Sequence, residues 1–246
     1  MKASIIIPYY SGRRKQFERT MFTLSKQTHE DFEVIVIDDG SDDYDEHLEI
    51  ENKYVVGMYH LLRERGAAPR SPNMAYRKGY ELAQGEIIIL SNPEVLVPFN
   101  ALKVMLINMK TDRRNVPVQY HLTYKQLKAI DTVDWRTNIH KLIGLPDFWS
   151  TQTPWLYTNA EAHQHRNHLN FCGATREVWD RYDFMPATDE WMNMENWLHP
   201  MELRDGYPAT GIGIEVYHQE HPRHYGSGAE KKYSARIQRM RDNELG

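Results

Sequence analysis

The stretch that decides the fold runs from Gly85 to Pro98 and reads GEIIILSNPEVLVP. Its short apolar run is rich in β-branched residues and follows a glycine, which predicts a strand buried on both faces, as in a parallel sheet. Pro93 has no N–H for a strand ladder, so the strand ends there and Glu94 follows on a rigid turn. Asn92 and Glu94 then lie at the carboxyl end of the strand, where open α/β sheets bind ligands. On this stretch alone, an ordinary strand exit with a solvated Glu explains the pattern equally well.

Two further buried strands precede this stretch. Residues 4–8 and 32–37 are apolar runs of strand length, and the segment between them has apolar residues at helical spacing. Strands that alternate with helices predict a parallel sheet covered by helices, with the strand ends at Tyr9, Asp38 and Glu94 on one edge. The further elements that we expect are a short strand within residues 54–62 and helices over 13–27, 71–83 and 101–109.

The pattern weakens in the second half of the chain. Residues 111–164 have no sustained period, so we expect long loops and short helices over the sheet face. Aromatic side chains in this segment either stack on a flat ligand or fill a second core layer, and these are Trp135, Trp149, Trp155 and Tyr157. Order returns over residues 169–175, a helix is expected to start near Glu177, and another is expected to end at Arg204.

Composition narrows the class of protein. The chain has 246 residues, of which 41% are hydrophobic and 26% charged, as in an ordinary globular protein, and we expect one domain. The formal net charge of -4 gives no general attraction to nucleic acid or to an anionic membrane. A single cysteine, Cys172, excludes an internal disulfide, and no apolar run has the length of a membrane span. We therefore expect a cytoplasmic protein.

Three segments of the N-terminal part resemble the family 2 glycosyltransferases. Residues 6–11 (IIPYYS) are similar to the family's first strand, which usually ends Pro-x-Tyr-Asn, and residues 36–43 (VIDDGSDD) are similar to its Val-Asp-Asp-Gly-Ser-x-Asp segment. Residues 90–95 (LSNPEV) resemble its metal-binding Asp-x-Asp motif, with Glu94 in place of Asp. The resemblance implies the GT-A fold, which is an α/β, Rossmann-like, mostly parallel sheet flanked by helices.

The resemblance also implies how the chain is divided and which donor it binds. Residues 1–98 would bind the nucleotide, and residues 99–246 would bind the acceptor, with the C-terminal tail over the site. The donor would be a UDP-sugar. The ring of Tyr10 would stack on its base, and Asp38 would accept a hydrogen bond from the uracil imide. The residues implied for nucleotide binding are Pro8, Tyr10, Asp38, Asp39, Arg65, Arg70 and Asn92.

A divalent cation for the departing phosphates is part of the same implication. Glu94 and the late histidine, His218, would hold it, and Mn²⁺ is the expected ion, with Mg²⁺ as the alternative. Two histidine clusters, over residues 163–168 and 218–224, suggest zinc, but structural zinc sites usually contain cysteine pairs that this chain lacks. We therefore assign only His218 to a metal.

The acceptor and the catalytic base are implied by two later segments. Cys172 and Gly173 lie where the family has its acceptor loop, and residues 194–196 (MEN) lie where it has its Glu-Asp catalytic pair. Inverting transfer needs a carboxylate that removes the proton of the acceptor hydroxyl, and Asn196 cannot do so. Glu195 is therefore the expected base. The alternatives are the neighbouring pair Asp189 and Glu190.

These observations lead to a metal-dependent hexosyltransferase that moves a sugar from a UDP-sugar to a hydroxyl of a glycan or other acceptor. The main rival is a nucleotide-sugar-binding domain without activity, because Asn196 replaces the usual base, and a related one is hydrolysis of the donor where transfer is weak. A nucleotidyltransferase ranks last, because the turn over residues 9–14 has one glycine and lacks a Gly-rich phosphate loop.

Overall fold

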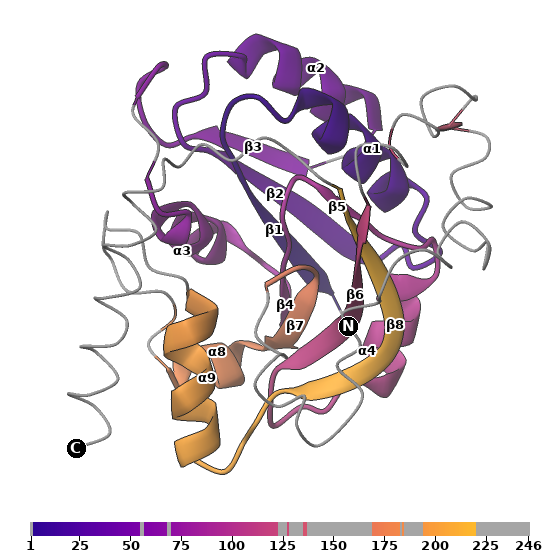
Figure 1. Ribbon diagram of the computed structural model, residues 1–246, viewed down its shortest axis with the longest axis vertical. Helices are drawn as coiled ribbons and strands as arrows, with labels where there is room; N and C mark the ends of the chain where they lie inside the picture. The colour runs from indigo at the N-terminus through magenta and orange to yellow at the C-terminus, as the bar shows by residue number, and fades with distance from the viewer. Residues whose placement is uncertain are drawn as a thin grey trace.

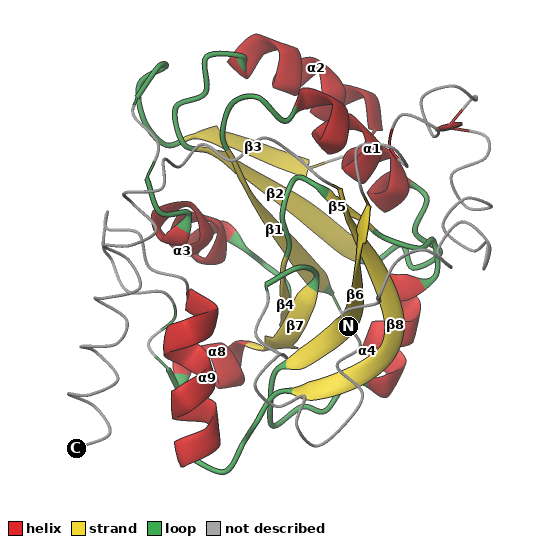
Figure 2. Ribbon diagram, viewed as in Figure 1, coloured by secondary structure: helices red, strands yellow, loops and turns green. Residues whose placement is uncertain are grey.

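Within the residues that the computed structural model describes, eight strands form one sheet, in the order β3-β2-β1-β4-β7-β6-β8-β5 (Figure 1). The residues that the structure describes are 2–54, 57–67, 70–122, 127, 135–136, 169–182, 184 and 194–219. Helices cover both faces of the sheet (Figure 2). This is the α/β architecture with a mostly parallel sheet that the sequence predicts.

The first half of the sheet is parallel. Its strands are β1 (Ala3–Tyr9), β2 (Phe32–Asp38), β3 (Gly57–Leu61) and β4 (Ile87–Leu90), and β1 lies between β2 and β4. Pro8 is tolerated inside β1 because β4 pairs only with residues 3–6, so the missing N–H would point past its end. All of these strands were expected from their apolar runs.

The second half of the sheet mixes directions. β7 (Cys172–Thr175) is antiparallel to β4, β6 (Asn115–Leu122) and β8 (Thr210–Gln219) are parallel to each other, and β5 (Val95–Leu96) is antiparallel to β8. The expectation of loops and short helices from residue 111 onward was wrong for residues 115–122, which form a strand. The apolar residues there alternate only briefly, and a search for one sustained period over the longer segment hides them.

Helices divide between the two faces of the sheet. α1 (Arg14–Ser25), α2 (Tyr44–Tyr54) and α4 (Ala101–Asn108) contribute to the core of one face. α3 (Asn73–Leu82), α8 (Arg176–Asp180) and α9 (Met194–Arg204) contribute to the core of the other. The predicted helices are confirmed, and α2 is an addition.

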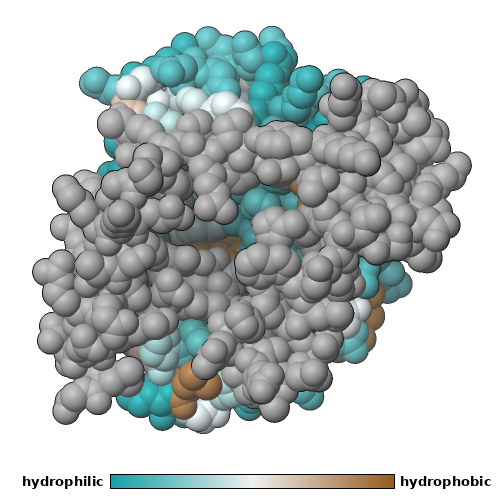
Figure 3. Space-filling model, in the orientation of Figure 1, coloured by the Kyte–Doolittle hydropathy of each residue, from teal (hydrophilic) through white to brown (hydrophobic). Residues whose placement is uncertain are grey.

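The unexpected helix α2 has a thin apolar stripe, which explains why its periodicity was not recognised. Ile50 is buried, whereas Asp45 and Glu46 in the first turn are exposed. Acidic residues in the first turn and Lys53 in the last turn suit the helix dipole. Hydrophilic residues gather at the top of the view in Figure 3, where α2 lies.

The central strands are buried on both faces. In β1, Ile5 and Ile7 pack with α1 and α4, whereas Ile6 packs with α3. Full burial of such a side chain contributes about 1.5–3 kcal/mol to stability. Gly79 brings α3 so close to β1 that a Cβ at this position would lie 2.3 Å from Ile6 Cγ2. The sheet therefore holds the strand ends of the candidate site rigidly.

The aromatic residues expected over the sheet face are described only at Trp135. Its ring meets that of Phe22 edge to face, with centroids 5.2 Å apart, which favours the core-layer alternative for this residue. Trp149, Trp155 and Tyr157 lie outside the described residues. Among the described residues, no helix is both long and apolar enough to cross a membrane.

Candidate functional site

The carboxyl ends of the parallel strands meet at one edge of the sheet, as predicted. Tyr9 pairs with Asp38 at the ends of β1 and β2. Backbone hydrogen bonds continue past the strands, from Asp39 N to Tyr9 O at 3.0 Å and from Leu62 N to Asp38 O at 2.7 Å. On the other side, Ser91 N donates to Ile6 O at 3.0 Å. This edge gathers the polar residues that follow each strand.

Asp38 shapes the turn that follows β2. Its Oδ1 atom accepts hydrogen bonds from Gly40 N at 2.9 Å and Ser41 N at 2.7 Å, and the side chain is fully buried. Gly40 has a φ of +90°, and a Cβ there would lie 2.6 Å from Glu64 O, so only glycine fits. Asp38 thus has a structural task, and its contact with a base stays a prediction.

Asp39, directly after β2, forms ion pairs with two arginines. Arg63 Nε lies 2.7 Å from Asp39 Oδ1, and Arg70 Nε lies 2.9 Å from Asp39 Oδ2. The Arg63 and Arg70 side chains are 24% and 14% exposed, so both are partly open to solvent. Arg65 instead pairs with Asp45 of α2 at 2.8 Å, and both side chains are more than half exposed.

Of the predicted arginines, the structure therefore brings Arg70 to the site and directs Arg65 to α2. Arg63 was missed. The signal for it was available, because it is the first cation after a third parallel strand, whose carboxyl end must lie on the same edge as the others.

Tyr10 borders the same loop. Its hydroxyl donates to Ala67 O at 2.7 Å, and its ring is half-buried. Burial, followed by the nearby Asp42 carboxylate, raises the pKa of Tyr10, so the phenol is neutral at physiological pH. This placement beside residues 63–70 is compatible with the predicted stacking of the Tyr10 ring on a nucleotide base.

Asn92 belongs to a chain of polar side chains that crosses the sheet edge. It accepts a hydrogen bond from Tyr76 Oη at 2.9 Å and donates to Asn170 Oδ1. Asn170 in turn donates to Gln119 Oε1 at 2.5 Å. The network joins α3, the turn after β4, the segment just before β7, and β6, so Asn92 connects the two halves of the sheet.

Glu94 and His218, the two predicted metal ligands, come together in the structure. β5 and β8 pair so that Val95 lies opposite His218, and Gln219 N donates to Glu94 O at 2.8 Å. His218 Nε2 lies 3.3 Å from Glu94 Oε1, with side-chain exposures of 15% and 6%. Strand pairing thus joins a carboxylate and an imidazole from distant parts of the sequence.

Helix α1 fixes the surroundings of this pair. Thr20 Oγ1 donates to Pro93 O at 2.8 Å, which holds the turn before Glu94. The buried Arg19 donates from Nη1 to Gln219 Oε1 at 3.0 Å, which holds the end of β8. At the start of the helix, Arg13 Nη1 lies 3.7 Å from Glu94 Oε2.

The pair fits a divalent cation whose coordination is completed by substrate. Among the described residues, no group of three or more histidine, cysteine, aspartate or glutamate side chains forms a metal cage. Mg²⁺ sites that serve phosphate substrates commonly use one or two carboxylates together with phosphate oxygens and water. A carboxylate and an imidazole at 3.3 Å are suitable for such a partial shell, and the imidazole favours Mn²⁺ over Mg²⁺.

The residues implied for the acceptor lie inside the sheet. Cys172 pairs with Leu90 and Gly173 with Ile89, and both are buried. A Cβ at Gly173 would lie 2.9 Å from Met105 Sδ, so the position is filled by α4. Their described environment is that of core residues, and the acceptor role stays a prediction.

The implied catalytic base is on α9. Glu195 is the second residue of this helix, whereas Asp189 and Glu190 lie outside the described residues. Pro200 interrupts the helix ladder, because it has no N–H to donate to the carbonyl of Asn196. The turn that carries Glu195 therefore has one backbone bond fewer than the rest of the helix.

A buried ion pair anchors the other end of α9. Arg114 donates from Nε and Nη2 to the two carboxylate oxygens of Glu202 at 2.8 and 2.9 Å, and the side chains are 0% and 1% exposed. Burial opposes ionisation of Glu202, but the Arg114 guanidinium outweighs it and holds the pKa of Glu202 below its ordinary value. The pair joins α9 to the residue before β6.

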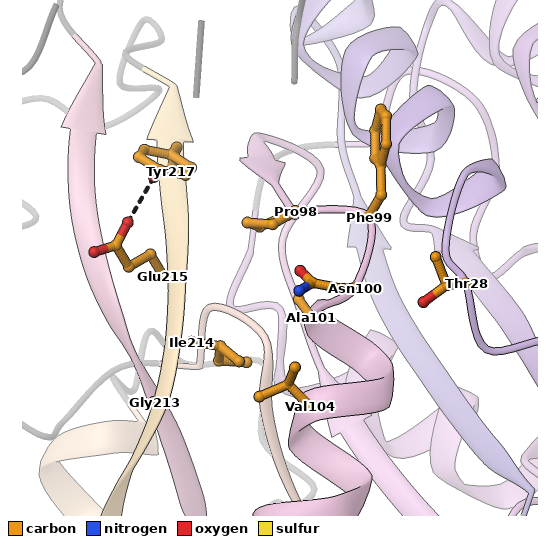
Figure 4. A pocket seen from close by; sticks show the side chains of 10 residues that line it. All are labelled: Thr28, Pro98, Phe99, Asn100, Ala101, Val104, Gly213, Ile214, Glu215 and Tyr217. Atoms are coloured by element: carbon orange, nitrogen blue, oxygen red, sulfur yellow. Dashed lines mark hydrogen bonds between the residues drawn. The ribbon is translucent and has the colours of Figure 1, made fainter. Parts of the chain in front are cut away.

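A pocket of about 490 Å³ lies elsewhere, between β8 and the start of α4 (Figure 4). Tyr217 Oη donates to Glu215 Oε2 at 2.8 Å on its wall. The described residues that line it are Thr28, Pro98, Phe99, Asn100, Ala101, Val104, Gly213, Ile214, Glu215 and Tyr217. None of them is a predicted site residue, so this pocket is separate from the predicted donor residues.

A parallel half with an Asp-Asp turn, continued by strands of mixed direction that bring His218 of β8 beside Glu94, is a GT-A glycosyltransferase fold. The chain belongs to glycosyl transferase family 2, because the model of that family matches residues 4–179. No curated protein sequence matches the chain.

Solved structures of S. aureus TarS share this fold. TarS 1–349 in complex with UDP-GlcNAc has a TM-score of 0.55 and 17% identity, over 95% of this chain and 62% of that one. TarS 1–349 without that ligand gives 0.59 and 16%, over 89% and 60%. Its complex with UDP gives 0.56 and 17%, over 89% and 61%. The chain therefore spans about 60% of the length of these structures.

Proposed function

We propose that the protein transfers a hexosyl group from a UDP-sugar to a hydroxyl of a glycan or other acceptor, with the help of a divalent cation. Family membership supports glycosyl transfer, and the structures of TarS with UDP-GlcNAc and with UDP support a uridine nucleotide donor. The observation that carries the proposal is the meeting of Glu94 and His218 at 3.3 Å beside the strand ends.

In this proposal residues 1–98 bind the donor nucleotide and residues 99–246 the acceptor. Tyr10 and Asp38 meet the base, and Arg70 and Arg63, both held by Asp39, present positive charge to the donor. Glu94 and His218 hold the cation, Mn²⁺ in preference to Mg²⁺, which when bound neutralises the charge of the departing diphosphate.

Glu195 acts as the general base in an inverting transfer. A glutamate with an ordinary pKa of about 4.3 is ionised near neutral pH, as a base that removes a hydroxyl proton must be. The proton moves from the acceptor hydroxyl to the carboxylate while the hydroxyl oxygen attacks the anomeric carbon. Asn196 beside it cannot take a proton, so it does not act as the base. Hydrolysis of the donor is the alternative outcome where transfer is weak.

The test is nucleotide release from a panel of UDP-sugars with and without Mn²⁺. Glu94→Gln and His218→Ala should each lower Mn²⁺-dependent turnover by about 10²- to 10³-fold, because charge stabilisation of the leaving diphosphate is lost. Glu215→Gln, an exposed carboxylate on the same strand as His218, is the matched control. Full metal-dependent turnover in either site variant would contradict the assignment of Glu94 and His218. If the unsubstituted protein releases nucleotide from none of the UDP-sugars, the alternative of a nucleotide-sugar-binding domain without activity is favoured.

A second variant separates transfer from binding. Glu195→Gln keeps the shape of the side chain and removes its basicity, so turnover should fall by about 10²- to 10⁴-fold with donor affinity nearly unchanged. If turnover instead survives this change and falls with Asp189→Asn or Glu190→Gln, the base belongs to that pair.

A further inference from the structure

Arg13 occupies a position that no part of the proposed function uses. It precedes α1, and its backbone N–H donates to Tyr9 Oη at 3.3 Å. Tyr9 in turn donates to Asp43 Oδ2 at 3.3 Å, and burial, followed by the Asp43 carboxylate, raises the pKa of Tyr9, so its hydroxyl remains protonated. Arg13 is thus held in place at its backbone by the end of β1.

The side chain of Arg13 extends from this anchor toward the predicted metal ligands. Its Nη1 atom lies 3.7 Å from Glu94 Oε2, on the opposite carboxylate oxygen from His218, and the side chain is only 13% exposed. The Arg13 Nε atom is buried and has no hydrogen-bond partner among the described residues. Buried hydrogen-bond donors seldom lack an acceptor, which points to an acceptor supplied by a ligand.

A guanidinium beside the ligand of a divalent cation has two opposite effects. It repels the cation, because both are positive and share one carboxylate. It also attracts the anion that the cation would neutralise, and at the start of a helix the backbone dipole acts in the same direction. A diphosphate is the anion that suits both groups, since its oxygens accept from the guanidinium fork and also ligate metal.

We propose that Arg13 binds the diphosphate of the donor and, when no nucleotide is bound, weakens the affinity of Glu94 and His218 for free metal. Metal and diphosphate then enter the site together rather than separately. The inference rests on the proposed function, because it takes the donor to be a nucleoside diphosphate sugar.

Arg14 provides the matched control. It follows Arg13 directly and is the first residue of α1, but its Nη1 atom lies 2.6 Å from Glu46 Oε2 of α2, and its side chain is 48% exposed. Substitution of Arg14 therefore removes one positive charge from the same part of the chain and leaves the Arg13 guanidinium beside Glu94 in place.

The experiment is isothermal titration of the parent, Arg13→Met, Arg13→Lys and Arg14→Met with three probes, namely Mn²⁺ alone, UDP in EDTA, and uridine. Arg13→Met should bind UDP in EDTA about 10- to 100-fold more weakly, because a charge-assisted hydrogen bond to phosphate is lost. It should bind uridine within about twofold of the parent and Mn²⁺ alone several-fold more tightly. Arg13→Lys should restore part of both effects, and Arg14→Met should show neither.

Equal UDP affinity in the parent and in Arg13→Met, or binding of Mn²⁺ alone that is no tighter in Arg13→Met while uridine binding is retained, would overturn the inference while leaving the proposed function in place. A parent that binds neither UDP nor any UDP-sugar would overturn both. A simple loss of structure in Arg13→Met is distinguished from the expected result, because it would weaken uridine and Mn²⁺ binding together with UDP.

Discussion

Two pairings of carboxylate with arginine in this molecule use the same chemistry in different surroundings. Asp39, only 5% exposed, lies between Arg63 and Arg70 at the carboxyl ends of the parallel strands, where these two arginine side chains are 24% and 14% exposed. Arg114 and Glu202 are 0% and 1% exposed beneath α9. The arginines of the first pairing are partly open to solvent, whereas both partners of the second are enclosed. The comparison teaches that exposure, rather than the hydrogen-bond geometry, separates a pairing that can exchange partners from one that fixes the structure.

The largest expected effect is on the buried pair. Arg114→Met leaves the Glu202 carboxylate buried without its partner, which should lower the free energy of unfolding by about 3–5 kcal/mol. The double variant Arg114→Met/Glu202→Leu removes both charges and should recover most of that loss. Urea denaturation followed by circular dichroism measures both. A double variant as unstable as the single one would show that the pair itself, rather than the unpaired charge, supplies the stability.

A smaller effect is expected at the partly exposed pairing of Asp39, and it should appear mainly in binding rather than in stability. Arg70→Met leaves the buried Asp39 carboxylate paired with Arg63, so the free energy of unfolding should fall by less than the loss of about 3–5 kcal/mol expected when a buried charge loses its partner. The affinity for UDP should fall by about tenfold, because one charge-assisted contact is lost. Arg65→Met, whose parent side chain pairs with Asp45 on the surface, should change neither. A large loss of stability in Arg70→Met would remove the distinction between the two pairings.

The smallest effect is the dependence of stability on pH. The folded pKa of Glu202 is below its unfolded value, so its contribution is present above the unfolded pKa and is lost as the pH falls through the folded pKa. Unfolding free energies of the parent should therefore decrease on acidification below about pH 4.5, the ordinary value of the carboxyl group. The double variant should show a shallower decrease over the same range, and identical slopes would contradict a depressed pKa.

Much of the site edge was predictable from short segments. Residues 36–43 and 90–95 combine a buried strand with a polar turn, and both the strand and its polar end are local properties of the chain. The turn at Gly40 illustrates this, because glycine is the residue type expected where the backbone adopts a positive φ, here +90°. The same local reading failed for α2 and for residues 115–122, where the apolar pattern is thin or brief.

By itself, the sequence determined the four parallel strands of the first half, most of the helices, the Asp-Asp turn and the family, because strand and helix periods and short motifs are local properties of the chain. Only the tertiary structure decided that Arg63 rather than Arg65 lies at Asp39, that Arg13 reaches Glu94, and that Arg114 is buried against Glu202. These contacts depend on which strands become neighbours and on how each helix packs over them. Such pairings are set by the burial of whole faces, and no short segment contains that information.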